Sequence, residues 1–355
     1  MVNLIEYYNM ENLLEILATP KQVGLLIGAG VSKACGLPNV EDLTKDVKKK
    51  IVNKKFNELL DAKDNVETIL NKVQQLKTLI TGDKAINELT LKMVETIEKE
   101  IKETIFKKLS IETSFEKISD LVIWLNFING ENQKEIFTLN YDLLVESALE
   151  KNSLPYFSGF IGNVKPFFMA DSVDDFTGLY VKKSWTKLWK LHGSLNFKKS
   201  KTDQIFIENN TDSEYENLLV YPSMDKYMSS RKAPFIAYLD RFRKYLLNNE
   251  KVLLILGYSF SDDHVNDILI NGLNNNSRLS VFAFCYDEKT LTKCIDVLGK
   301  YPNISAYSDK QKFINKTKSE FESDKNIGDF NDFITIVSSL VSQNNPVITD
   351  EENNS

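Results

Sequence analysis

The sequence has few cysteines and histidines, and it has no excess of basic residues. It contains three cysteines and two histidines among 355 residues. The cysteines are Cys35, Cys285 and Cys294, and no two of them have CxxC spacing. A disulfide framework is therefore not expected, and a four-cysteine zinc site is impossible. The formal net charge of −6 gives no overall attraction to nucleic acid or to an anionic membrane.

Long apolar runs are also missing from the sequence. No stretch approaches the ~20 uninterrupted apolar residues that a membrane-spanning helix needs. The first twenty residues carry early acidic groups and lack the basic and then apolar order of a signal peptide. We therefore expect a cytoplasmic protein with no membrane partner and no direct nucleic-acid partner. The composition, with 42% hydrophobic and 26% charged residues, is typical of a globular protein with a sizeable core.

Short apolar runs alternate with helical patterns along most of the chain. Most of the runs lack polar alternation, which favours strands covered on both faces, as in a parallel sheet. Strands that alternate with helices indicate an α/β domain. The predicted strands are 23–28, 135–140, 188–193, 217–222, 251–257 and 279–286, and the predicted helices are 142–151, 231–248, 262–275 and 287–299.

Residues 41–130 have a different character. They are rich in Lys, Glu, Leu and Ile at helical spacing and contain almost no Gly or Pro, which predicts an inserted helical subdomain. A turn is expected at Thr81-Gly82-Asp83. The α/β domain then comprises residues 1–40 and 131–310. Residues 311–355 are expected to form a helix near 328–343, whose apolar face must be covered by the domain or by another subunit, and a polar tail.

A small-residue turn follows the first predicted strand. Gly28 and Gly30 flank Ala29, and Ser32 comes two residues later. Such residues let a backbone approach a phosphate, and amide N–H groups at a helix start favour an anion. The same glycines also fit a tight strand-to-helix turn that needs only backbone freedom. Neither a GxGxxG nor a P-loop pattern is present, so the turn alone does not decide between these readings.

Two polar residues lie at the ends of other predicted strands. Asn140 ends the run 135–140, and His192 ends the run 188–193. In open α/β sheets, ligands bind outside the carboxyl ends of the strands. Taken alone, His192 fits a packed, hydrogen-bonded histidine as well as a catalytic one. The convergence of an amide, an imidazole and the small-residue turn favours an active site.

These motifs together resemble a known family. "GAGVS…GLP", "TLNYD" and "HGS" resemble the NAD-binding and catalytic motifs of the sirtuin superfamily, in that order. "LLILGYSFSDDHV" resembles the family's Gly-x-Ser strand end near the adenine-side ribose. "TxNYD" and "GYSFSDxHV" are most similar to the zinc-less, sirtuin-like NAD-hydrolase effectors of bacterial antiphage defence. The resemblance covers roughly residues 20–300 and implies a Rossmann-like, mostly parallel sheet with helices on both faces and the inserted helical subdomain.

The resemblance implies an NAD⁺ glycohydrolase that releases nicotinamide and ADP-ribose from NAD⁺ and requires no metal. Asn140 would position the attacking water, and His192 would act as the general base. The implied NAD-binding residues are Gly28, Ala29, Gly30 and Ser32 at the pyrophosphate, Asp142 on the nicotinamide side, and Gly257 and Ser259 at the adenosine ribose.

Simpler roles stay open for several of these residues. Asp142 is also a good N-cap for the helix that follows it, and the two roles can coexist. Ser259 is also a plausible turn-end hydroxyl. Ser261 or Asp262 is expected to cap the next helix, with His264 in a structural or interface role in its first turn.

Two other function classes remain as alternatives. One is an NAD-dependent protein deacylase or ADP-ribosyltransferase. The missing cysteine module, and "NVEDL" in place of the Asp-Phe-Arg that commonly follows GxP, argue against deacylation. The other is a non-enzymatic sensor of NAD or ADP-ribose, which would need neither Asn140 nor His192.

An NAD-depleting enzyme also needs a switch, since uncontrolled hydrolysis would poison its own cell. The resemblance implies either homo-oligomerisation or assembly with a helicase-like motor ATPase. The helical insertion and the apolar C-terminal helix are the candidate contact surfaces.

Overall fold

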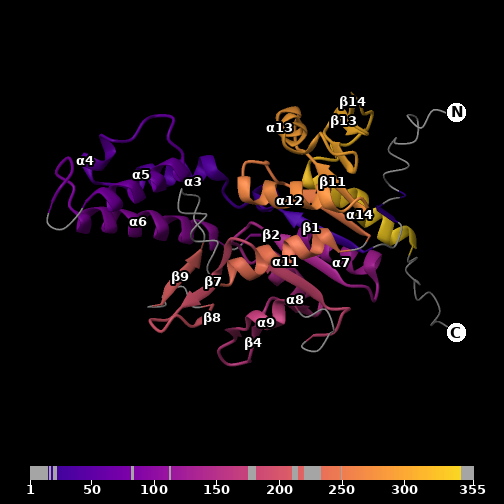
Figure 1. Cartoon of the computed structure of the whole chain (residues 1–355), viewed down its shortest axis with the longest axis horizontal. Helices are drawn as coiled ribbons and strands as arrows, with labels where there is room; N and C mark the ends of the chain where they lie inside the picture. Colours follow the sequence, from indigo (N-terminus) through magenta and orange to yellow (C-terminus); the bar gives the residue numbers. More distant parts are fainter. Residues whose placement is uncertain are drawn as a thin grey trace, which may run out of the picture.

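The computed structural model describes residues 15, 17–18, 22–80, 84–111, 113–174, 181–209, 215–219, 233–248 and 250–344. A central sheet flanked by helices forms the body of the molecule, and a group of helices extends from one side of it (Figure 1). A second, smaller sheet lies next to these helices in the same view.

A nine-stranded sheet forms the centre of the α/β body. Its strands are β1 (Val23–Ile27), β2 (Lys134–Thr138), β3 (Tyr156–Phe157), β6 (Thr186–Lys190), β10 (Lys251–Leu256), β11 (Leu279–Phe284), β12 (Ile304–Tyr307), β13 (Gln311–Ile314) and β14 (Thr317–Glu320). Their spatial order is β14-β13-β12-β11-β10-β1-β2-β6-β3. All neighbours from β12 to β3 are parallel, and only β13 and β14 are antiparallel additions at one edge. The mostly parallel sheet predicted from the unalternated apolar runs is confirmed.

Helices cover both faces of the sheet, as predicted. Successive residues of a strand point to opposite faces, and in β1 Leu25 and Ile27 join one core cluster while Leu26 joins the other. The first face is covered by α2 (Ala29–Ala34), α7 (Glu116–Asn129), α8 (Leu144–Lys151) and α14 (Phe330–Asn344). The second face is covered by α11 (Phe235–Leu247), α12 (Asp263–Asn275) and α13 (Glu288–Leu298).

The helices α3 (Val40–Lys50), α4 (Lys54–Asn57), α5 (Val66–Leu79) and α6 (Leu91–Leu109) form a helical unit with a core of its own. Asn39 and Asn65 cap α3 and α5 by accepting hydrogen bonds from backbone N–H groups of the first turns. The apolar stripes of α5 and α6 pack against each other rather than against the central sheet. Helix α7, which lies within the range 41–130, instead packs on β1 and β2. We therefore propose that the insertion comprises α3 to α6.

A five-stranded antiparallel sheet lies beside the carboxyl end of β6, and the sequence did not predict it. Its strands are β4 (Phe160–Ile161), β5 (Phe167–Phe168), β7 (Gly193–Lys199), β8 (Ile205–Ile207) and β9 (Glu216–Leu219), in the order β4-β5-β8-β7-β9. The predicted strand 217–222 was wrongly grouped with the parallel strands, because β9 pairs antiparallel with β7. Residues 220–222 lie outside the described part. A four-residue apolar run does not reveal which sheet it joins.

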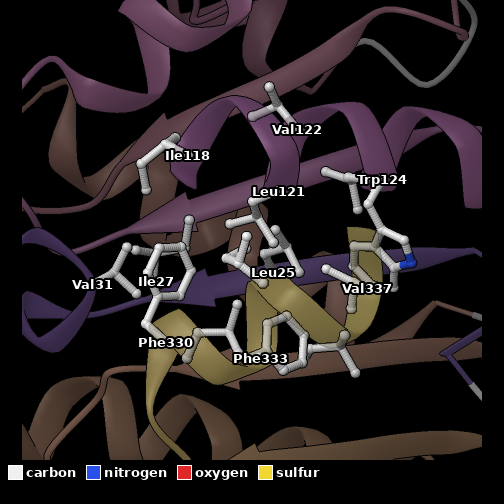
Figure 2. Packing of buried hydrophobic residues seen from close by; sticks show 14 of the residues in the cluster. Leu25, Ile27, Val31, Ile118, Leu121, Val122, Trp124, Phe330, Phe333 and Val337 are labelled. Atoms are coloured by element: carbon white, nitrogen blue, oxygen red, sulfur yellow. The ribbon is translucent and has the colours of Figure 1, made fainter. Parts of the chain in front are cut away.

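The C-terminal helix expected near 328–343 is present as α14. Its apolar residues face the body: Phe333 is fully buried and contacts Trp124 of α7 and Phe284 of β11. Figure 2 shows Phe330, Phe333 and Val337 pointing toward Leu25 and Ile27 of β1. The apolar face of α14 is therefore covered by the chain's own core, which corrects its assignment as a candidate contact surface.

The other predicted helices correspond to α8, α11, α12 and α13, with ends shifted by a few residues. The predicted turn at 81–83 and the tail beyond residue 344 lie outside the described residues. Among the helices that the structure describes, none is both long and apolar enough to span a membrane.

Candidate active site

Four neighbouring strands end at one edge of the central sheet, and each is followed by a predicted site residue. In the spatial order β10-β1-β2-β6, the residues that follow are Gly257, Gly28, Asn140 and His192. Thr138 of β2 is paired with Lys190 of β6, so Asn140 and His192 each lie two positions beyond a paired residue. Adjacent strands are ~4.8 Å apart. The parallel register thus brings the amide and the imidazole to the same edge, as the sequence predicted.

The glycines hold two loops in close contact. The N–H of Gly28 donates to Leu256 O (2.9 Å), and the N–H of Gly30 donates to Gly257 O (2.9 Å). A Cβ at Gly28 would lie 2.5 Å from Gly257 O, and a Cβ at Gly257, where φ is +63°, would lie 2.5 Å from Val31 N. These glycines are therefore required for packing between the turn and the end of β10, whatever ligand the turn binds.

The start of α2 is open to solvent. Ala29 and Gly30 are exposed, whereas Gly28 and Ser32 are buried. Ala29 is the first residue of α2, so its N–H has no acceptor within the helix. The N–H groups of Gly28 and Gly30 already donate to the β10 loop. Of the residues predicted to hold a pyrophosphate, Ala29 thus offers a backbone N–H donor. Gly30, which has no side chain, lets a phosphate come close to the backbone.

The orientation of the Asn140 amide is fixed by its neighbours. Its Nδ2 donates to Gly28 O (3.0 Å) and to Ser32 Oγ (2.7 Å). Because a backbone carbonyl accepts and never donates, the atom facing Gly28 O must be the amide nitrogen. Both N–H donors are then used, and Oδ1 is the polar atom that remains. Asn140 can therefore accept a hydrogen bond from a water or a hydroxyl.

Ser32 links Asn140 to Asp142. The Ser32 hydroxyl donates to Asp142 Oδ2 (2.5 Å) while its oxygen accepts from Asn140. The other carboxylate oxygen, Asp142 Oδ1, accepts from the N–H of Leu144 at the start of α8 (3.1 Å). The N-cap of α8 is Leu143, which makes no side-chain capping bond, so the N-cap role expected as an alternative for Asp142 is wrong by one position. Asp142 lies just before the cap and still accepts from the first N–H of the helix.

A buried lysine below this network was not predicted. Lys190 Nζ donates to Asp142 O and lies 3.1 Å from Glu146 Oε1. Burial raises the pKa of Glu146, even though the ammonium of Lys190 opposes this shift. The pair anchors the loop between β2 and α8 to β6. The sequence signal was a lysine within the apolar run "LWKLHG", because a charged residue in a buried strand needs a partner.

His192 lies next to an aspartate that was predicted only as the N-cap of a helix. His192 Nε2 lies 3.1 Å from Asp262 Oδ2, and both side chains are largely buried. Asp262 also caps α12, because its Oδ1 accepts from the N–H groups of His264 and Val265. The capping prediction for Asp262 is confirmed. The contact with His192 spans seventy residues of sequence, so no local pattern indicated it.

The remaining predicted residues lie on or near the loop that leads to Asp262. Ser259 is exposed, and its carbonyl accepts from Ser261 Oγ (3.3 Å). His264 lies in the first turn of α12 and is partly buried. The structure therefore places Ser259 on the β10 side of the site and His264 in the first turn of α12.

Cys35 lies close enough to the site for the charge of Asp142 to act on its thiol. Burial, and then the negative charge of Asp142, raise the pKa of Cys35 to about 11, so its thiol stays protonated at neutral pH. Among the residues that the structure describes, no group of three or more His, Cys, Asp or Glu side chains is arranged to hold a metal ion. The polar groups found here are an amide, an imidazole, a hydroxyl and carboxylates.

Comparisons with solved structures find many similar chains. A Sir2 homologue in complex with NAD is 15% identical, with a TM-score of 0.47 and 95% of each chain covered. A mutant Sir2 homologue in complex with 2′-O-acetyl-ADP-ribose is 14% identical, with a TM-score of 0.45. The match covers 95% of this chain and 99% of the other. A further mutant Sir2 homologue, in complex with ADP-ribose, is 13% identical, with a TM-score of 0.45. That match covers 94% of this chain and 98% of the other.

A search among curated proteins gives no significant match. Residues 134–307 match the model of the SIR2-like domain family. This range begins at β2 and ends at β12, so it contains Asn140, His192 and Asp262 but not the glycine turn. The segment that carries the amide, the imidazole and the capping aspartate is thus similar to the SIR2-like domain.

Proposed function

We propose that this protein is an NAD⁺ glycohydrolase. In the proposed reaction the oxygen of water bonds to C1′ of the nicotinamide ribose, and the bond from C1′ to the nicotinamide nitrogen breaks. The electron pair of the broken bond stays with nicotinamide, which leaves as a neutral molecule. One proton from the water passes to a base and then to solvent, and the products are nicotinamide and ADP-ribose.

One observation carries the proposal. Asn140 and His192 follow the neighbouring strands β2 and β6 in equivalent register, and β2 lies next to β1, which the glycine turn follows. Because both N–H groups of the Asn140 amide are held by the protein, its Oδ1 is left to accept from water or a ribose hydroxyl. This acceptor lies at the edge where parallel α/β sheets bind their ligands.

A neutral amide suits cleavage of the bond between ribose C1′ and the nicotinamide nitrogen. Cleavage builds positive charge on the ribose, and a carboxylate at the same place could itself attack the sugar and form a covalent intermediate. An amide oxygen orients water without that side reaction. His192 supplies a nitrogen base that accepts the proton of the water or of a ribose hydroxyl.

Substrate binding is proposed for the residues that frame this pair. The start of α2, with exposed Ala29 and Gly30, would contact the pyrophosphate, since amide N–H groups and a helix start favour an anion. Exposed Ser259 would contact the adenosine ribose. Ser32 and Asp142 would act mainly by holding Asn140, because their polar atoms already bind each other.

Product analysis tests this function. The purified chain is incubated with NAD⁺, and nicotinamide and ADP-ribose are separated and quantified. We expect equimolar release, and we expect Asn140→Ala and His192→Ala each to reduce it by at least about 100-fold while the variants remain folded. A variant at either position with full activity would remove that residue from the mechanism.

The same assay separates the alternative functions. A deacylase would consume NAD⁺ only when an acetylated peptide is present, and an ADP-ribosyltransferase would attach ADP-ribose to protein rather than release it. A sensor would bind NAD⁺ or ADP-ribose without releasing nicotinamide. We favour hydrolysis because three cysteines cannot form the four-cysteine module of the deacylases that this sequence resembles.

We further propose that the enzyme depletes NAD⁺ as a triggered effector of antiphage defence. Control would come from homo-oligomerisation or from a helicase-like motor ATPase partner. With α14 packed into the body, the helical unit is the remaining candidate contact surface, and it exposes Val52, Leu79 and Met93. Mass measurement by size-exclusion chromatography with light scattering tests this idea, and a strict monomer with full activity would contradict it.

A further inference from the structure

The histidine of the proposed site has a buried carboxylate partner. His192 Nε2 and Asp262 Oδ2 are 3.1 Å apart, and their side chains are 12% and 7% exposed. The separation is within the range of a hydrogen bond, and burial shields the contact from water. It joins the loop after β6 to the loop after β10, which are separated in the sheet by β1 and β2. The two loops are thus tied together across the carboxyl edge.

Asp262 is itself held rigidly. Its Oδ1 accepts from the N–H of His264 (3.1 Å) and of Val265 (3.4 Å) at the start of α12. This leaves Oδ2 as the carboxylate oxygen that faces His192. A carboxylate at a helix N-terminus is further stabilised by the helix dipole.

The loop that carries Asp262 is also fixed from within. Tyr258 OH donates to Asn266 Oδ1 (2.9 Å), and Asn266 Nδ2 donates to Phe260 O (3.0 Å). Phe260 has a φ of +54°, which is uncommon for a bulky residue and persists only where the surroundings enforce it. The Tyr258 and Phe260 rings pack together at 4.9 Å. These contacts keep the loop in the shape that presents Asp262 to His192.

We propose that Asp262 is a positioning residue that fixes the ring orientation and the tautomer of His192; this inference rests on the proposed function of the site. An acceptor at Nε2 requires a proton on Nε2, so in the neutral ring the lone pair lies on Nδ1. Nδ1 is then the nitrogen that accepts a proton in the proposed reaction. Asp262 does not touch the substrate.

The variant Asp262→Asn separates positioning from capping. Asparagine is as good an N-cap as aspartate, so its Oδ1 keeps the bonds to His264 and Val265. Its Nδ2 then faces His192 and donates, which forces the proton of the neutral ring onto Nδ1. The matched control is Asp263→Asn, which removes the same charge from the next residue, an exposed one.

Histidine tautomers are read directly by long-range ¹H–¹⁵N correlation spectra over a pH series. The chain has only two histidines, so His264→Gln assigns both ring systems. We expect the neutral ring of His192 to carry its proton on Nε2 in the wild type and in Asp263→Asn, and on Nδ1 in Asp262→Asn. An Nδ1–H tautomer in the wild type, or the same tautomer in all three proteins, would overturn the proposal.

Kinetics give the second readout. Asp262→Asn should lower kcat for NAD⁺ hydrolysis by at least about 100-fold with KM changed less than about threefold, because it alters the base and not the binding residues. Asp262→Ser keeps a capping hydroxyl but is too short to reach His192, and it should show the same loss. Full kcat in both folded variants would overturn the proposal. A wild type that hydrolyses no NAD⁺, either alone or together with its proposed activating partner, would refute the proposed function, while the tautomer comparison would still decide the role of Asp262.

Discussion

The amide of Asn140 is held by a backbone carbonyl and a serine hydroxyl, and the serine in turn donates to a buried carboxylate. Each group in this chain has a hydrogen-bond partner. Gly28 O and Ser32 Oγ accept hydrogen bonds from the two amide N–H groups, and Asp142 accepts one from the serine hydroxyl. A hydrogen-bonded chain of this kind costs most when its middle member is removed, because two buried polar groups then lose a partner.

Removal of that middle member is the first prediction. Ser32→Ala should lower the free energy of unfolding by about 1–3 kcal/mol, since Asp142 Oδ2 and Asn140 Nδ2 both lose a bond. It should also lower NAD⁺ hydrolysis at least about tenfold, because Asn140 is no longer held. Urea denaturation and the nicotinamide assay measure the two effects, and Ser261→Ala on the exposed loop is the control. Unchanged stability together with full hydrolysis would show that the chain of bonds is unimportant.

Single residues also mark the limit of what the sequence predicts. The positions of Asn140 and His192 at one edge of the sheet were predictable, because strand ends can be located from apolar runs and parallel strands share a carboxyl edge. The partners Asp262 and Lys190 were not, because their contacts depend on tertiary geometry. Asp262 precedes a helix and so has a sufficient local explanation as a cap, which conceals its second role.

At the scale of elements, the turn after β1 and the end of β10 meet without space for side chains. Gly257→Ala should therefore combine backbone strain with a clash against Val31 N. We expect at least about 2 kcal/mol of destabilisation and loss of hydrolysis. Gly130→Ala is the control, because Gly130 also has a positive φ (+51°) but has no atom within 4 Å of its would-be Cβ and precedes β2 at the opposite edge. Equal loss of hydrolysis in both variants would contradict this account.

The helical unit has its own buried ionic group at Glu98 of α6. Burial alone would raise the pKa of Glu98, but hydrogen bonds and charge from Lys102 and Lys77 outweigh it and lower the pKa below 4.5. A lowered carboxyl pKa adds stability that is present above about pH 4.5 and is lost as the pH falls through the folded value.

Glu98→Gln should therefore reduce stability by about 1–2 kcal/mol at pH 7, with a difference from the wild type that shrinks below about pH 4. Urea denaturation of both proteins between pH 3 and pH 7 measures the difference. Glu95→Gln, at an exposed position of the same helix, should show little change at any pH. A pH-independent difference for Glu98→Gln would contradict the ionic explanation.

At the scale of the whole molecule, α14 completes the body rather than offering a surface. Phe333→Ala should cost about 3–5 kcal/mol, because the ring is fully buried against Trp124 and Phe284. Ile123→Ala on the partly exposed side of α7 should cost much less. Thermal denaturation gives the stabilities. A Phe333→Ala protein of normal stability but altered oligomeric mass would restore α14 as an interface.

The overall architecture was predictable to a different degree in different parts. Runs such as "VGLLIG" and "KVLLILG" indicate the parallel strands, since burial on both faces removes polar alternation. The small sheet contains strands of two to seven residues, and pairs such as Phe160–Ile161 are too short to carry a periodic signal. The burial of the apolar side of α14 was left open because amphipathic periodicity shows which face is apolar but not what covers it.

The central claim is that Asn140 faces the nicotinamide ribose of a bound NAD⁺. The most direct measurement is a crystal structure of the His192→Ala variant with NAD⁺, because loss of the base should keep the substrate intact whatever activates the wild type. We expect Asn140 Oδ1 to lie within about 4 Å of ribose C1′ or of a water that lies next to it. A dinucleotide bound elsewhere on the molecule, or bound with its nicotinamide ribose away from Asn140, would contradict the account.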